Sequence, residues 1–154
     1  MEREIKFRAW NIEQKVMCYD NEDSRANYWD GVNSSDVNMV NNIFNPWNQI
    51  YIWMQYTGLK DKNSKDIYEG DIVSISKKMD WLPLVLVGNK YEVSYISAFA
   101  QYSMFLVKSD YTFINDLSSD EEVIDFNNDV ALTIEVIGNI YENPELLEND
   151  STNN

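Results

Sequence analysis

The spacing of apolar residues along the chain predicts mostly β-strands. Residues 4–10 alternate between apolar and charged side chains, and this period of two is typical of a half-buried strand. Its buried face would be formed by Ile5, Phe7 and Ala9, with Lys6 and Arg8 exposed. Runs rich in aromatic and β-branched residues predict further strands at 15–19, 50–59, 67–78, 91–97, 102–108 and 130–141.

Turn-forming residues between these runs predict hairpins. Residues 60–66 (KDKNSKD) would reverse the chain between two strands, and residues 98–101 (AFAQ) would do the same for a second pair. The triplet Glu-Gly-Asp at 69–71 predicts a glycine bend or bulge where a strand enters a small barrel. The fold class predicted is mainly β, a β-rich α+β protein with a partial or SH3-like β-barrel and additional strands.

One helix is predicted in the second half of the chain. Residues 118–129 begin with the Ser-x-x-Glu pattern of a capping box, which favours a short acidic helix. Its inward side chains would be Val123, Ile124 and Phe126.

The chain length fits a single domain, which we expect over residues 1–147. Within it, the polar and Asn-rich residues 20–49 predict a long loop or insertion, and residues 148–154 predict a disordered tail.

The predicted core draws on several strands. It would consist of Ile5, Phe7, Ile52, Met54, Tyr56, Ile72, Ile75, Val136 and Ile140. The middle of the chain holds more aromatic residues than one modest core readily absorbs, namely Trp81, Tyr91, Tyr95, Phe99, Tyr102 and Phe105. These residues either fill the core or lie at an interface, where Tyr and Trp are favoured.

The amino-acid composition excludes several kinds of functional site. The chain has no histidine and one cysteine, Cys18, which excludes an intramolecular disulfide, the usual zinc sites and acid–base schemes that use histidine. No apolar run approaches the roughly 18 residues of a membrane helix, and the N-terminus lacks the apolar core of a signal peptide. We therefore expect a cytoplasmic protein without a cofactor.

The turn between the strands at 50–59 and 67–78 is rich in carboxylates. An EF-hand loop starting at Asp61 would need Gly at its sixth position and Glu at its twelfth, but Asp66 and Ile72 stand there. A looser magnesium site from Asp66, Glu69 and Asp71 competes with a simple charged hairpin. Three lysines in the same turn would neutralise the carboxylates, so we expect the hairpin.

Other catalytic patterns are weak. Glu13, Asp80 and Glu92 stand alone in the sequence, and no spacing brings two of them together as an acid–base pair. Cys18 has no histidine to activate it and is expected to be a buried structural thiol. The five glycines are scattered, so no glycine-rich phosphate loop occurs.

Charge is strongly polarised along the chain. Residues 1–108 contain 14 acidic and 12 basic residues, whereas residues 109–154 contain 12 acidic residues and no basic one. Such a region repels nucleic acid and favours partners with basic surfaces. The candidate partner-binding residues are Asp116, Asp120, Glu121, Glu122, Asp125 and Asp129. Their carboxylates would either imitate the phosphates of a nucleic acid or only form a solvated face.

Three segments resemble one protein family. They are REIKFRAWN at 3–11, MQYTGLKDKNSKDIYEGDIV at 54–73 and EVIGNIYENPELL at 135–147. Together they are similar to the YopX family of proteins from phages and prophages of Gram-positive bacteria. The resemblance implies a mostly β, partly barrel-like and oligomeric accessory protein, and it implies no catalytic residues.

These observations favour a non-enzymatic phage or prophage accessory protein that binds host or phage proteins and forms a homo-oligomer. A sharper form of this hypothesis is an acidic inhibitor that mimics nucleic acid and acts on a host defence or nucleic-acid-handling protein. Two alternatives stay open: a small metal-dependent enzyme that uses carboxylates alone, and a purely structural self-assembling protein.

Overall fold

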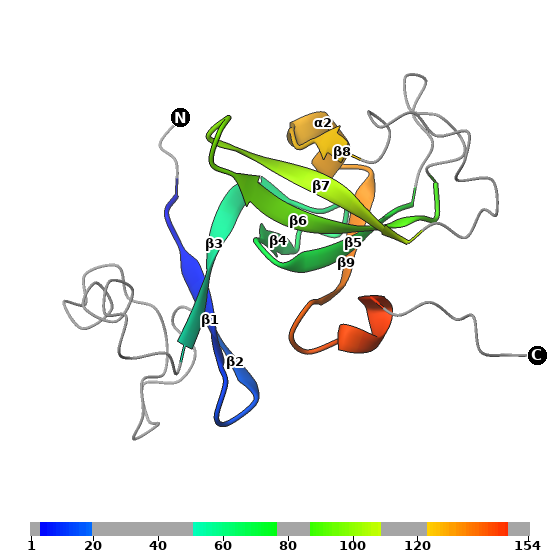
Figure 1. Ribbon diagram of the computed structural model, residues 1–154. Coiled ribbons are helices and arrows are strands. Elements are labelled where there is room, and N and C mark those ends of the chain that lie inside the picture. Colours follow the sequence, from blue (N-terminus) through cyan, green and yellow to red (C-terminus); the bar gives the residue numbers. More distant parts are fainter. Residues whose placement is uncertain (1–3, 20–50, 77–86, 109–122, 148–154) are drawn as a thin grey trace, which may run out of the picture. The chain divides into compact units, whose positions relative to one another are not determined.

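The structure, a computed structural model, describes residues 4–19, 51–76, 87–108 and 123–147 (Figure 1). The chain forms two compact units, Met1–Gly58 (unit 1) and Leu59–Asn154 (unit 2). The single domain predicted over residues 1–147 stays a prediction, and the predicted loop at 20–49 and tail at 148–154 lie outside the described residues. The elements are β1 (Phe7–Asn11), β2 (Val16–Tyr19), β3 (Tyr51–Lys60), β4 (Asp66–Tyr68), β5 (Asp71–Ile75), β6 (Lys90–Ile96), β7 (Gln101–Lys108), β8 (Val123–Asp125), α2 (Asn128–Ala131), β9 (Ile134–Asn139) and the 3₁₀ helix η3 (Pro144–Leu147).

Unit 1 is built on β1, which pairs antiparallel with β2 on one side and with β3 on the other. Asn11 fixes the β1–β2 turn, because its Oδ1 accepts hydrogen bonds from the backbone N–H groups of Glu13 (3.0 Å) and Gln14 (2.9 Å). β3 continues into unit 2, where it pairs with β4, so the strand order of this sheet is β2-β1-β3-β4.

The predicted alternation along β1 is wrong at two residues. Ile5 was expected in the core but is 58% exposed, because it lies before the strand begins. Arg8 was expected at the surface but is only 2% exposed. β1 is buried over four consecutive residues, so side chains on both of its faces are covered, and a period of two does not describe such a strand.

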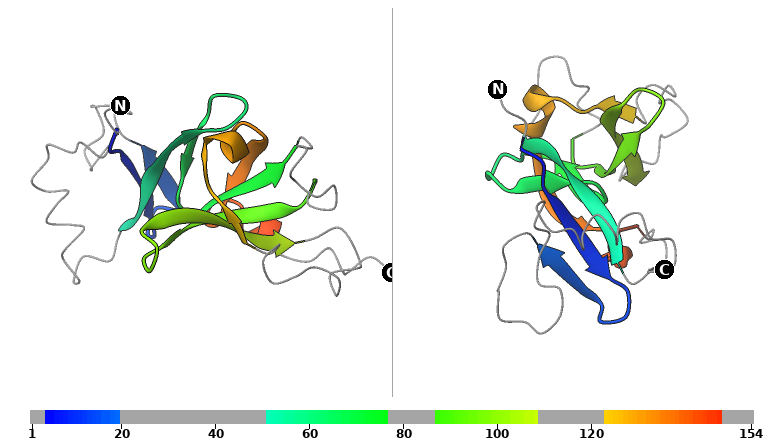
Figure 2. Two further views of the ribbon diagram at one scale, coloured as in Figure 1. Left: turned by 90° about the horizontal axis from the view of Figure 1, so that it is seen from above. Right: turned by 90° about the vertical axis from the view of Figure 1, so that its left-hand side faces the viewer.

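Unit 2 contains a five-stranded antiparallel sheet with the order β8-β7-β6-β5-β9. The strands curl into half of a barrel (Figures 1 and 2). A register shift between Ile72 and Val73, opposite β9, adds local twist. The prediction of a mainly β protein with a partial barrel is confirmed, and so is the β6–β7 hairpin through residues 97–100.

The hydrophobic core of unit 2 lies on one face of this sheet, covered by α2 and β4. Its buried residues are Ile67, Val73, Ile75, Tyr91, Val93, Tyr102, Met104, Ile124, Val130, Ala131, Ile134 and Val136. The nine residues predicted for the core divide into three groups. Met54, Tyr56, Ile72, Ile75 and Val136 are buried, Phe7, Ile52 and Ile140 are partly buried, and Ile5 is exposed.

The strand predicted at 67–78 is broken in two. β4 ends at Tyr68, a tight turn follows at Glu69 and Gly70, and β5 starts at Asp71 in the other sheet. Gly70 has a φ of 77°, which the third residue of a type II turn requires and which glycine adopts without steric cost. Its N–H donates to the carbonyl of Val93 (2.8 Å), and its own carbonyl accepts from Ile140 (3.0 Å). The predicted glycine bend is therefore confirmed as the point where the chain changes sheets.

The helix predicted at 118–129 is wrong at residues 123–127. Residues 123–125 form β8, which pairs with β7 so that Ile124 lies opposite Met104, and only residues 128–131 are helical. Pairing with an available sheet edge overrides the local capping pattern, because a strand there buries Ile124 in the core. The short helix α2 is capped by Asn127, whose side chain accepts from the N–H groups of Asp129 and Val130.

The chain after β9 turns sharply around Asn139. Oδ1 of Asn139 accepts from the N–H groups of Tyr141 (3.0 Å) and Glu142 (2.9 Å), and its Nδ2 donates to the Glu142 carboxylate. A Cβ on Gly138 would lie 2.6 Å from Oδ1 of Asn143, so glycine gives the returning chain room to pack against β9.

Candidate interaction surfaces

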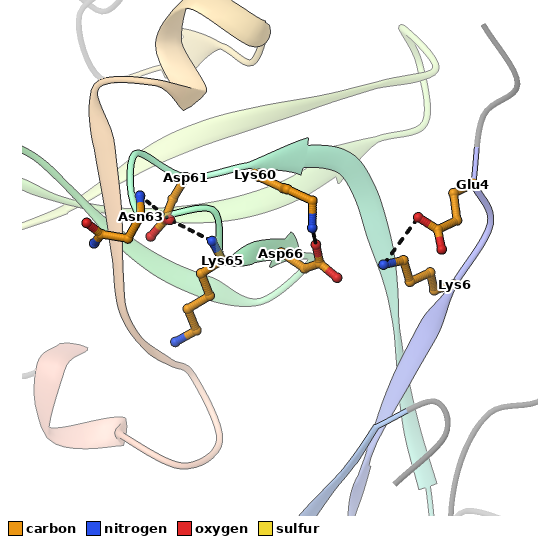
Figure 3. A network of polar contacts seen from close by, with 7 residues as sticks. All are labelled: Glu4, Lys6, Lys60, Asp61, Asn63, Lys65 and Asp66. Atoms are coloured by element: carbon orange, nitrogen blue, oxygen red, sulfur yellow. Dashed lines mark hydrogen bonds and ion pairs between the residues drawn. The ribbon is translucent and has the colours of Figure 1, made fainter.

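Two carboxylates of the β3–β4–β5 region have partners within the fold. Asp66 pairs with Lys60, as Figure 3 shows, and Oδ2 of Asp71 accepts a hydrogen bond from the N–H of Tyr68 (2.8 Å) across the tight turn. Within the described parts of the chain, no three His, Cys, Asp or Glu residues are placed to hold a metal ion together. The expected charged hairpin is confirmed between β3 and β4.

Asp61, considered in the sequence only as the first position of an EF-hand loop, instead fixes the turn between β3 and β4. Its Oδ1 accepts from the N–H groups of Asn63 (2.8 Å) and Lys65 (2.9 Å), which shapes the hairpin turn (Figure 3). Its Oδ2 accepts from the N–H of Val136 on β9 (3.0 Å). The N–H of Lys62 also donates to the carbonyl of Ile134 (3.1 Å), so this turn covers the outer edge of β9. Asp followed by Lys-Asn-Ser is a recognisable signal for such a turn.

Cys18 is a buried thiol on β2, as predicted. Burial raises the pKa of its thiol, so less of the reactive thiolate is present near neutral pH. We expect iodoacetamide to alkylate Cys18 about tenfold or more slowly in the folded protein than in urea at the same pH. Equal rates in the two states, measured by mass spectrometry, would show that the thiol is accessible and that the burial is wrong.

Two of the three other carboxylates considered for catalysis, Glu13 and Glu92, lie in described parts of the chain. Glu13 lies in the exposed β1–β2 turn, and Asp80 lies outside the described residues. Glu92 accepts a hydrogen bond from the hydroxyl of Ser94 (3.1 Å) on the same strand. Burial, and then the charges of Glu92 and Glu69, raise the pKa of Tyr141, which keeps its phenol protonated.

The predicted partner-binding residues are described only in part. Asp116, Asp120, Glu121 and Glu122 lie outside the described residues. Asp125 belongs to β8 and Asp129 to the first turn of α2, where its side chain is exposed. These two residues do not share one helix face, so the geometry assumed for the acidic helix is wrong at this end. Their role in binding a partner stays a prediction.

The aromatic residues of the middle block divide between the core and the surface. Tyr91 and Tyr102 are buried in the core of unit 2, Phe105 is partly buried, and Trp81 lies outside the described residues. Phe99 and Tyr95 are 71% and 45% exposed, and both belong to the end of the β6–β7 hairpin. Their exposure gives unit 2 an apolar patch at the end of this hairpin.

Comparison with known proteins agrees with the sequence resemblance. A family profile described as YopX protein matches residues 6–148. Among solved structures, a crystal structure of protein EF1440 from Enterococcus faecalis is similar over 96% of this chain and 100% of that chain, with 27% sequence identity and a TM-score of 0.49. No curated protein matches significantly. Within the described residues, no helix has the length and apolar character needed to cross a bilayer.

The segments that carry the resemblance serve the fold. In the segment at 54–73, Asp61 fixes the hairpin turn and Gly70 fixes the change of sheet. In the segment at 135–147, Asn139 fixes the last turn. The roles found for these three residues are structural. The hairpin end and the acidic residues at 116–129 lie outside all three segments.

Proposed function

Because the chain belongs to the YopX protein family, we propose that it is a non-enzymatic accessory protein of a phage or prophage that binds a host or phage protein. It acts in the cytoplasm of the host bacterium, as a homo-oligomer. The observation that carries this proposal is the placement of charge, since residues 109–154 contain 12 acidic residues and no basic one. Such a segment attracts a basic protein surface and repels nucleic acid.

The finer form of the proposal concerns the kind of partner. A basic surface that normally binds nucleic acid is lined with Lys and Arg side chains for phosphate contacts. The six candidate carboxylates between Asp116 and Asp129 would occupy such a surface and exclude its nucleic acid. The partner is then a host defence or nucleic-acid-handling protein, and this chain is its inhibitor.

Neutralising five of these carboxylates is expected to abolish partner binding and leave folding intact. The variant combines Asp120→Asn, Glu121→Gln, Glu122→Gln, Asp125→Asn and Asp129→Asn, and it raises the net charge from −14 to −9. Affinity capture from host lysate, followed by mass spectrometry, would measure the loss of the partner that the unchanged protein retains.

A matched control changes the same amount of charge elsewhere. It neutralises five carboxylates of the nearly balanced first part of the chain, namely Glu2, Glu13, Asp20, Glu22 and Asp23. We expect this control to keep the partner. If both variants retain the partner, the acidic segment is not the binding surface. If both lose it, binding depends on the net charge of the protein and not on the position of these carboxylates.

A further inference from the structure

The end of the β6–β7 hairpin displays two aromatic rings on a well-defined turn. The strands stay paired up to Ile96 and Gln101, and the loop between them is closed by hydrogen bonds from the N–H of Phe99 to the carbonyl of Ile96 (3.2 Å) and from the N–H of Ala100 to the carbonyl of Ser97 (3.4 Å). The loop projects beyond the neighbouring strands in each view (Figures 1 and 2). We call residues 95–100 the hairpin tip.

The conformation of the hairpin tip is fixed by its surroundings. Ala100 has a φ of 52°, a left-handed conformation that costs a non-glycine residue about 1 kcal/mol. The ring of Tyr95 packs edge-to-face on Tyr102, with ring centroids 5.2 Å apart, and Tyr102 belongs to the core. An aromatic side chain presented on a rigid turn loses little conformational entropy when it binds.

Charge distinguishes the hairpin tip from the rest of the surface. A quarter of the chain is charged, but residues 93–107 contain no Asp, Glu, Lys or Arg. A basic partner surface, which suits the acidic segment, would lose hydration against this tip and gain no ion pair. The matching surface is therefore uncharged and apolar, with at most a hydrogen-bond acceptor for the hydroxyl of Tyr95.

The exposed area favours a pocket over a flat contact with a second copy. With about 200 Å² for a whole aromatic side chain, the exposed fractions of Tyr95 and Phe99 offer on the order of 230 Å² per chain. Two such tips would bury about 500 Å², well below the 1,000 Å² or so of a stable interface. A single aromatic ring in a close-fitting pocket, in contrast, is a common centre of binding energy.

We propose that the hairpin tip anchors this protein to its protein partner, with the ring of Phe99 inserted into an uncharged, apolar pocket of that partner. The proposal rests on the function proposed above and adds a second contact to the acidic segment. Phe99 supplies affinity that does not depend on salt, whereas the carboxylates supply attraction that salt screens.

Site-specific photo-crosslinking tests the location of the contact. Phe99→p-benzoylphenylalanine is expressed in host cells, and Lys65→p-benzoylphenylalanine, an exposed position in the β3–β4 turn, is the matched control. We expect one partner protein to be crosslinked from position 99 and not from position 65. An adduct between two copies of this chain at position 99, or no adduct there, would overturn the proposal.

Affinity for the purified crosslinked partner tests the contribution of the ring. Phe99→Ala is expected to weaken binding about 30-fold or more, as loss of a central aromatic anchor does, while Phe99→Leu keeps most of the affinity. The loss should be the same from about 50 to about 500 mM salt. Because Phe99 is largely exposed, its variants should melt at the temperature of the unchanged protein.

The outcome separates the two proposals. If Phe99→Ala binds the partner as well as the unchanged protein does while the charge-neutralised variant does not, the anchor is wrong and the proposed function stands. If the unchanged protein binds no partner at any salt concentration, both proposals fail.

Discussion

Replacing Asp61 with alanine is expected to lower the free energy of unfolding by about 3–5 kcal/mol, because a buried carboxylate that accepts three backbone hydrogen bonds is removed. The side chain is 3% exposed, so water cannot readily replace it. The N–H of Val136 would be left without its acceptor next to the core, and the β3–β4 turn would lose its contact with β9. Urea unfolding followed by tryptophan fluorescence would measure the change.

Two matched variants separate the contribution of the Asp61 hydrogen bonds from that of the nearby surface ion pair. Asp61→Asn keeps one oxygen for the turn but directs an NH₂ group toward the N–H of Val136, so we expect an intermediate loss of about 2 kcal/mol. Glu135→Gln breaks only the surface ion pair with Lys62 at the same junction and should cost about 0.5 kcal/mol or less. A loss below about 1 kcal/mol for Asp61→Ala would contradict its structural role.

Replacing Asn139 with alanine is expected to lower the free energy of unfolding by about 2–3 kcal/mol, since two backbone N–H groups lose a buried acceptor. Asn139 is 4% exposed, and its backbone carbonyl also accepts from the N–H of Asn143 (3.0 Å). Its loss would release the chain that returns past Gly138. Thermal unfolding monitored by circular dichroism would detect the change.

Asn127 provides a closely matched control for Asn139. Its Oδ1 also accepts from two backbone N–H groups, those of Asp129 (2.9 Å) and Val130 (3.1 Å), but Asn127 is exposed at the start of α2. Water can replace an exposed cap, so Asn127→Ala should cost only about 1 kcal/mol. If the two alanine variants lose equal stability, burial is not what makes Asn139 important.

The sequence predicted the strands well where residue type and turn chemistry agree. The β6–β7 hairpin and β3 combine aromatic and β-branched residues with clear turns at their ends. Around residues 123–125 the sequence favours two different structures. The preceding Ser-x-x-Glu pattern favours the start of a helix, whereas Val-Ile-Asp is compatible with a strand. These residues form a strand because they pair with the edge of β7, and this edge cannot be recognised from the local sequence.

The two stabilising side chains differ in how far the sequence reveals them. The turn bonds of Asn139 and of Oδ1 of Asp61 reach residues two to four positions ahead, so they follow a local pattern. The bond from Asp61 to Val136 joins residues 75 positions apart. Only the folded chain brings these two residues together, so a local pattern could not predict the bond. The exposure of Phe99 likewise depends on the folded structure and could not be predicted from a local pattern.

Residues that stabilise the fold and residues proposed to bind a partner lie in different segments of the chain. The segments at 3–11, 54–73 and 135–147 hold turns that fix the fold, whereas the hairpin tip and the acidic residues at 116–129 lie between them. For this chain, we expect one charged and one apolar element to act on the same partner.

The hypothesis that this chain acts by binding a protein can be tested directly by calorimetry. The purified partner is titrated with this protein at salt concentrations from about 50 to about 500 mM. We expect binding that weakens steadily as salt screens the acidic segment and that keeps a residual, salt-independent affinity from the hairpin tip. An affinity that does not change with salt, or the absence of any partner that binds, would contradict the account.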